Sequence, residues 1–123
     1  MPTLAQASLT GVERRTLDLL VELLKRDLGP ELHAVWLFGS GARGEEPRAE
    51  SDVDLIVLTE GGWDHDQGRV IDLVFEAADA EGAAPTYFSA HVRDAGWVEE
   101  RRAIEDFFIR EVDRDKVVLY GEP

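Results

Sequence analysis

The connection between two apolar segments is the feature that most restricts the fold of this chain. Residues 32–38 and 53–58 are short and rich in Val, Leu, Ile, Trp and Phe, which is typical of buried strands. The residues between them, 39–51, are polar and contain three glycines and a proline, which indicates a loop. A covered crossover between parallel strands needs room for a helix, and this loop is too short for one. The two strands are therefore predicted to be antiparallel neighbours.

The rest of the chain alternates between helical and extended patterns. Apolar side chains recur at helical spacing over 10–28, 68–81 and 97–112, and strands are predicted over 86–92 and 117–120. The helix between the second and third strands permits a parallel pair. We therefore predict a single α/β (α+β) domain over residues 1–123, a small mixed β-sheet covered by helices, preceded by a loose leader at 1–9.

Two of the helices carry more detailed predictions. Thr10 and Glu13 have the spacing of a capping box, which places the first helix start at Thr10. In the last helix the predicted buried face consists of Trp97, Ile104, Phe107 and Phe108.

Charge and composition exclude several classes of protein. The chain has 26 acidic and 13 basic residues, a formal net charge of −13. This charge repels phosphate backbones, so we expect no direct nucleic-acid binding by this domain alone. No apolar run approaches the roughly 20 residues of a membrane-spanning helix, and the first residues lack the pattern of a signal peptide. With no cysteine in the chain, we expect a cytoplasmic protein without a membrane partner.

The loop begins with a glycine-rich turn that suits a phosphate group. Gly39, Gly41 and Gly44 permit the backbone to come close to a ligand, and successive N–H groups in such a turn attract anions. Ser40 adds a hydroxyl donor, and Arg43 adds a guanidinium that suits phosphate oxygens. Taken alone, the turn is explained at least as well by a flexible hairpin loop.

Two acids open the second strand. Asp52 and Asp54 are two residues apart, so strand alternation places both on one face while Val53 and Leu55 point into the core. Asp is disfavoured in strands, and two carboxylates on one face repel each other unless a cation lies between them. Mg²⁺ is coordinated by carboxylate oxygens and commonly by substrate phosphates at the same time. Taken alone, the pair is better explained as a solvated strand end, but the phosphate turn is joined to it by one short loop.

The two motifs together resemble a known family. The run from Gly39 to Gly44, followed by Asp52-Val53-Asp54, is similar to the nucleotidyltransferase superfamily, and specifically to its minimal MNT-type members and the kanamycin nucleotidyltransferase core. The clear match covers about residues 35–58. The resemblance implies a fold related to the palm of DNA polymerase β.

The resemblance also implies an activity and roles for the motif residues. The activity is Mg²⁺-dependent transfer of a nucleoside monophosphate, AMP in our prediction, from a nucleoside triphosphate to an acceptor. Gly39 and Ser40 would hold the triphosphate, with Arg43 as a further phosphate contact. Asp52 and Asp54 would be the catalytic metal ligands, for one Mg²⁺ or a two-ion site.

One departure from the family leaves a second function open. Active members usually carry a third carboxylate on a later strand, but residues 86–92 contain no acid, and His91 is there more simply explained as a structural side chain. Asp72 and Glu76 lie on the polar face of a predicted helix. The alternative is therefore a catalytically weak, nucleotide-binding antitoxin-type module. MNT-type chains resemble one half of toxin–antitoxin pairs, so a HEPN-type helical partner fits both functions, and a homo-oligomer also stays open.

Overall fold

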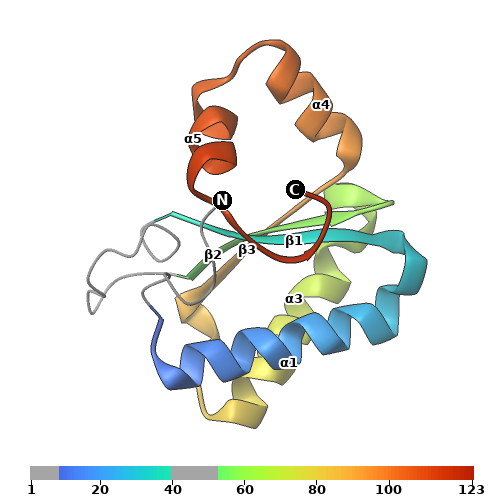
Figure 1. Ribbon diagram of the computed structural model, residues 1–123. Coiled ribbons are helices and arrows are strands. Elements are labelled where there is room, and N and C mark those ends of the chain that lie inside the picture. The colour runs from blue at the N-terminus through green and yellow to red at the C-terminus, as the bar shows by residue number, and fades with distance from the viewer. Residues whose placement is uncertain (1–8, 40–52) are drawn as a thin grey trace.

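The computed structural model describes residues 9–39 and 53–123 and contains a four-stranded mixed sheet (Figure 1). The strands β1 (Leu32–Phe38), β2 (Val53–Thr59), β3 (Phe88–Arg93) and β4 (Val117–Gly121) lie in the order β3-β2-β1-β4. β1 is antiparallel to β2 and to β4, and β2 is parallel to β3. The antiparallel and parallel pairings expected from the connections are both confirmed.

Helices cover both faces of the sheet. The helices α1 (Gly11–Leu28) and α3 (Gly62–Glu81) lie on one face, and α4 (Ala95–Ala103) and α5 (Phe107–Asp115) lie on the other (Figure 1). Two short 3₁₀ helices, η2 (Gly29–Glu31) and η3 (Pro85–Tyr87), precede β1 and β3. The predicted fold class, a mixed sheet covered by helices, is confirmed.

Strand alternation divides the buried side chains into two clusters. Leu55 and Val57 of β2 belong to the larger cluster, which also contains the buried leucines of α1 and the buried residues of α3. Ile56 and Leu58 point to the opposite face and belong to a smaller cluster that includes Val98 of α4 and Ile109 of α5. Because successive strand residues point to opposite faces, β2 is buried from both sides.

The start of α1 follows its sequence signal. The Thr10 hydroxyl accepts a hydrogen bond from the Glu13 N–H at 3.1 Å, and the Glu13 carboxylate accepts one from the Thr10 N–H at 2.8 Å. The capping box is confirmed, and it satisfies two N–H groups that the helix itself leaves without a partner.

The helix predicted over 68–81 begins earlier, at Gly62, so its predicted start was wrong. The reason is a set of polar contacts that do not match the usual capping pattern. The Gly62 N–H donates to the Thr59 hydroxyl at 2.9 Å, and the Gly61 N–H donates to the buried Asp66 carboxylate at 3.0 Å. These acceptors hold the first turn although no side chain caps it from the N-cap position.

Two other predicted elements differ from the structure. Thr86 and Tyr87, placed in the third strand by their β propensity, belong to η3, which Pro85 starts. The helix predicted over 97–112 is two helices, because Glu105 adopts a positive φ of 54° and Asp106 caps a new start. The predicted burial of this face was consequently wrong for three side chains: Ile104 is 63% exposed, Phe107 is 71% exposed and Phe108 is 40% exposed.

None of the helices within 9–39 and 53–123 combines the length and apolar character that crossing a membrane requires.

Candidate functional site

The turn after β1 and the acid of β2 lie against each other. Gly39 has a φ of +81°, and a Cβ added to it would lie 2.7 Å from Oδ2 of Asp54. The antiparallel register pairs Phe38 with Asp54, which explains this proximity. A side chain at position 39 would therefore displace the carboxylate, and glycine is required here both by its φ and by the space. The backbone at Gly39 and the Asp54 carboxylate form one small cradle of polar groups.

Asp54 lies on the face of the sheet that α4 and α5 cover. It is two residues before Ile56, which belongs to the smaller cluster on that face. Its partner across the strand pair, Phe38, packs against the same cluster. The carboxylate is thus at the end of a buried strand and is itself half-buried. The motif residues Ser40, Arg43 and Asp52 lie outside the described residues, so the site that they are expected to form with Asp54 stays a prediction.

The strand beside Asp54 carries no acid. The parallel register places Ser89 next to Asp54 and His91 next to Ile56. The His91 ring packs against the ring of Phe38 with centroids 5.7 Å apart, a contact that suits a structural side chain. Within 9–39 and 53–123 no three His, Asp or Glu residues gather closely enough to hold a metal ion. In the described part of the chain, Asp54 is therefore not joined by a third carboxylate from β3.

A hollow between the end of β1 and α5 adjoins Gly39. Its volume is about 140 Å³, and Phe38 and Phe108 form part of its apolar wall. Their rings meet edge to face with centroids 5.5 Å apart, which fixes the position of α5 over the strand. Glu111 and Asp115, one helical turn apart on α5, line the same hollow. Sequence reasoning missed these two acids, although their spacing of four residues places them on one helix face.

Trp63, an aromatic side chain in the first turn of α3 that could in principle stack on a base, lies at the other end of the sheet from Gly39. It is 47% exposed, and its ring is 5.3 Å from the Arg93 guanidinium. Arg93 pairs with Leu58, four residues beyond Asp54, a separation of about 13 Å along a strand. The position does not support a stacking role at the Gly39 turn.

Comparison with known proteins identifies the family. A family model described as polymerase beta, nucleotidyltransferase matches residues 19–122, which includes all four strands. The chain belongs to this family. The resemblance of the glycine turn and the Asp pair to nucleotidyltransferases is confirmed by this match, and the enzyme class expected from it is that of a nucleotidyltransferase.

Solved structures with a similar fold include toxin–antitoxin complexes. A mutant of a toxin–antitoxin pair named MntA-HpeT has 22% identity over 83% of this chain and 71% of that chain, with a TM-score of 0.51. A toxin–antitoxin with AMP-PNP has 23% identity over 84% and 72% of the two chains, with a TM-score of 0.53. At such identities the likeness shows the fold alone. A search of curated proteins found no match.

In this nucleotidyltransferase domain, a partly exposed ionic network that includes one buried ammonium group fastens α5 to the sheet. Arg102 of α4 donates two hydrogen bonds to the Asp113 carboxylate, at 2.9 and 2.7 Å, and Lys116 donates a third at 2.8 Å. The Lys116 ammonium is buried and lies 3.8 Å from the ring centroid of Trp36 in β1. Burial alone would raise the pKa of Asp113, but the hydrogen bonds from Arg102 and Lys116 outweigh it, so its pKa lies below the ordinary value.

We expect Asp113→Asn to destabilise the domain by about 1–3 kcal/mol at neutral pH, because hydrogen bonds to a charged group are lost and Lys116 stays buried. The folded-state pKa of Asp113 is below the ordinary 3.8, so its contribution is complete above that pH and is lost as pH falls through the folded-state pKa. Urea unfolding of both proteins from neutral to strongly acidic pH measures this. The difference in unfolding free energy should shrink at the acidic end, and a pH-independent difference would exclude the ionic explanation.

Proposed function

We propose that this domain binds a nucleoside triphosphate with Mg²⁺ and transfers a nucleoside monophosphate, AMP in the first instance, to an acceptor. The observation that carries the proposal is the Asp54 carboxylate held against the backbone of Gly39. An oxygen ligand for a hard cation and a glycine turn for phosphate are thereby brought together at the ends of two adjacent strands. Membership of the nucleotidyltransferase family supports the same activity.

Each motif residue then has a defined task. Gly39 and Ser40 would hold the triphosphate through backbone N–H groups and a hydroxyl, and Arg43 would contact a phosphate. Asp52 and Asp54 would hold the metal. When bound, Mg²⁺ neutralises phosphate charge and orients the phosphates. Gly39 has no Cβ, so it can adopt its positive φ and let the backbone approach the phosphates.

The reaction requires an acceptor hydroxyl beside the α-phosphorus. The hydroxyl oxygen forms the new bond to phosphorus, the bond from phosphorus to the bridging oxygen breaks, pyrophosphate leaves, and the hydroxyl proton passes to a base. The hollow of about 140 Å³ beside Gly39 is smaller than the roughly 300 Å³ or more of typical small-molecule sites. It has room for one side chain, which favours an acceptor presented by another protein.

We further propose that this acceptor protein is a HEPN-type helical partner. The proposal rests on the resemblance of the motifs to MNT-type domains and on the fold shared with toxin–antitoxin proteins, one of them described with AMP-PNP. The alternative is a nucleotide-binding antitoxin-type module of weak activity. Active family members usually carry a third carboxylate on a later strand, and β3 contains no acid, which favours slow transfer by this chain alone.

We expect the isolated chain to transfer nucleotides slowly, and transfer to become fast when a partner presents an acceptor with its own base. General-base assistance is worth about 10²–10⁴-fold, which sets the expected difference. The measurement is incorporation of label from ATP labelled at the α-phosphate, with Mg²⁺, for the chain alone and for the chain purified with co-expressed genomic neighbours. Rapid turnover on a small-molecule acceptor by the chain alone would contradict the need for a partner.

A further inference from the structure

The two edges of the sheet differ in chemistry. The outer edge at β3 carries the polar or charged residues Ser89, His91 and Arg93, which discourage pairing with another strand. The outer edge at β4 has the sequence Val-Val-Leu-Tyr-Gly, without a charge or a proline. Within 9–39 and 53–123, β4 pairs only with β1, so its other edge presents backbone groups without a strand partner. An apolar, uncharged edge of this kind is suited to pairing with a further strand.

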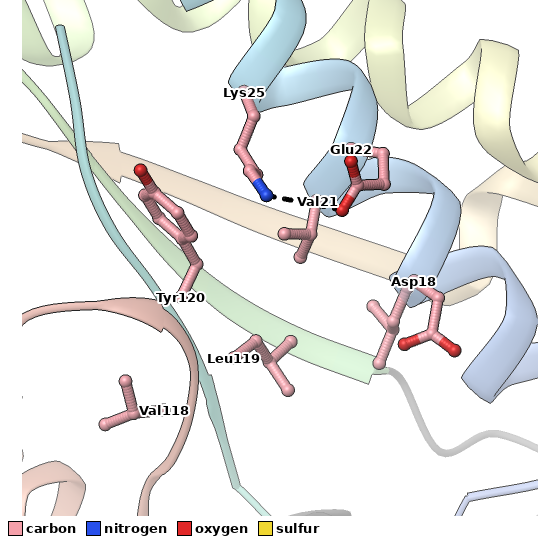
Figure 2. Close-up of a pocket in the computed structure, with 8 residues that line it drawn as sticks. Asp18, Val21, Glu22, Lys25, Val118, Leu119 and Tyr120 are labelled. Carbon is pink, nitrogen blue, oxygen red and sulfur yellow. Dashed lines mark hydrogen bonds and ion pairs between the residues drawn. The ribbon is translucent and has the colours of Figure 1, made fainter. Parts of the chain in front are cut away.

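A hollow runs beside this edge, between α1 and β4 (Figure 2). Its volume is about 370 Å³. The register of β1 with β4 shifts so that Leu119 is an extra residue on β4, a β-bulge. Leu119 and Tyr120 both pack against the larger core cluster, so the bulge directs two consecutive apolar side chains toward α1. Together with Val21 of α1 they give the hollow an apolar wall along the strand edge.

Of the three charged side chains around the hollow, Asp18 and Lys25 are placed for self-complementary pairing, and the third is Glu22. Asp18 and Lys25 of α1 both line it, and they are seven residues apart, about 10 Å along a helix. They are therefore too far apart to pair with each other. The Lys25 ammonium lies 3.4 Å from the Glu22 carboxylate and 5.6 Å from the ring centroid of Tyr120. A two-fold axis midway between Asp18 and Lys25 would place each of them opposite the other in a second copy.

One axis satisfies both the helix and the strand. On α1 the midpoint lies between Val21 and Glu22, so Lys25 is about 5 Å beyond it. On β4 the corresponding midpoint is the bulged residue, Leu119. Tyr120 is the next residue, about 3.4 Å further along the strand, and its ring lies under the Lys25 ammonium. A two-fold axis that passes between the two copies, beside Leu119 and level with the midpoint of α1, therefore brings β4 antiparallel to β4 of the second copy in the same register that opposes Lys25 and Asp18.

We propose that a second copy of this chain docks on the β4 edge, antiparallel to it, and forms a symmetric dimer with one sheet continuing through both copies. The contact consists of β4 against β4, Leu119 near the axis, and two equivalent pairs of Lys25 with Asp18 of the second copy. It is isologous, so it closes at two copies and does not propagate. The dimer does not depend on the proposed nucleotidyl transfer, because β4 and α1 carry neither Gly39 nor Asp54.

Sedimentation of the full chain in about 0.15 M salt tests the dimer, since this salt concentration screens the general repulsion between the acidic copies beyond about 8 Å. A short strand edge gives a small interface, so we expect reversible dimerisation with a Kd in the micromolar range. Leu119→Lys introduces a charge at the axis and should raise the Kd at least about tenfold. The matched control is Ile71→Lys, on the exposed side of α3, which should leave the Kd unchanged.

A charge exchange provides the decisive second measurement. Lys25→Asp and Asp18→Lys each convert two attractive pairs into repulsive ones, and each should raise the Kd about tenfold. The double variant restores both pairs across the axis and should return the Kd to within a few-fold of the original value. Circular dichroism confirms that each variant is folded.

A chain that sediments as a monomer up to about 300 µM would overturn the proposal, as would a dimer that Leu119→Lys leaves intact. A double variant as weak as its single variants would also overturn it. If the β4 edge instead binds a strand of another protein, this chain alone would sediment as a monomer.

Discussion

Asp54→Asn should abolish Mg²⁺-dependent binding of a nucleoside triphosphate while the domain stays folded. The carboxylate lies at the glycine turn, and its loss removes a negative oxygen ligand from the proposed metal. Changes in groups that only support a metal ligand cost about 10–100-fold in affinity, so loss of a ligand should cost at least about 100-fold. Calorimetric titration with ATP in the presence and absence of Mg²⁺ measures the effect. The double change of Asp52 and Asp54 to Asn should behave in the same way.

The matched control is Asp72→Asn. Asp72 is an exposed acid on α3, so its replacement makes the same change of charge far from the turn. It should leave ATP affinity unchanged. Unaltered ATP affinity of Asp54→Asn in Mg²⁺ would exclude a metal role for this residue, whereas a shared loss in both variants would point to net charge as the cause.

Gly121→Ala should cause the largest loss of stability among single methyl additions to the described glycines. A Cβ at this position would collide with the carbonyl oxygen of His33, and Gly121 has a φ of +77°. Both the contact with backbone and the left-handed conformation oppose a side chain, so we expect a loss of about 3–5 kcal/mol. Thermal and urea unfolding followed by circular dichroism measure it, and soluble expression gives a first indication.

Gly68→Ala supplies the opposite control. Gly68 lies inside α3, and a Cβ there would have no atom within 4 Å. Alanine should stabilise the helix by about 0.5–1 kcal/mol. If both variants lost the same stability, the strain at the end of β4 would not be the cause.

Much of the fold was predictable because neighbouring segments restrict each other. The short loop after Phe38 allowed only an antiparallel pair, and the helix before β3 allowed a parallel one. The contact of Gly39 with Asp54 follows from the same reasoning, since the loop joins the ends of paired strands. Family membership was also predictable, because the glycine turn and the Asp pair combine residue type, spacing and flanking strands.

Other features depend on contacts that sequence spacing does not record. The early start of α3 depends on Thr59 and on Asp66. The Asp66 carboxylate lies inside the helix and accepts a hydrogen bond from the Gly61 N–H, which precedes the helix. The apolar periodicity at 97–112 runs across a break at Glu105, whose positive φ no sequence rule requires. The position of Glu111 and Asp115 beside the turn depends on how α5 packs over β1, and only the folded chain shows it.

The separation of the buried side chains into a larger and a smaller cluster has a consequence for local unfolding. The cluster under α4 and α5 is the smaller one, and β1 and β2 remain packed against α1 and α3 on their other face. We therefore expect the layer formed by α4 and α5 to unfold as a separate cooperative unit while the rest of the domain stays folded. Amide hydrogens of α4 and α5 should then exchange with solvent sooner than those of α1 and α3. The free energy of local unfolding of α4 and α5, and not the free energy of global unfolding, would then determine how often solvent reaches the glycine turn.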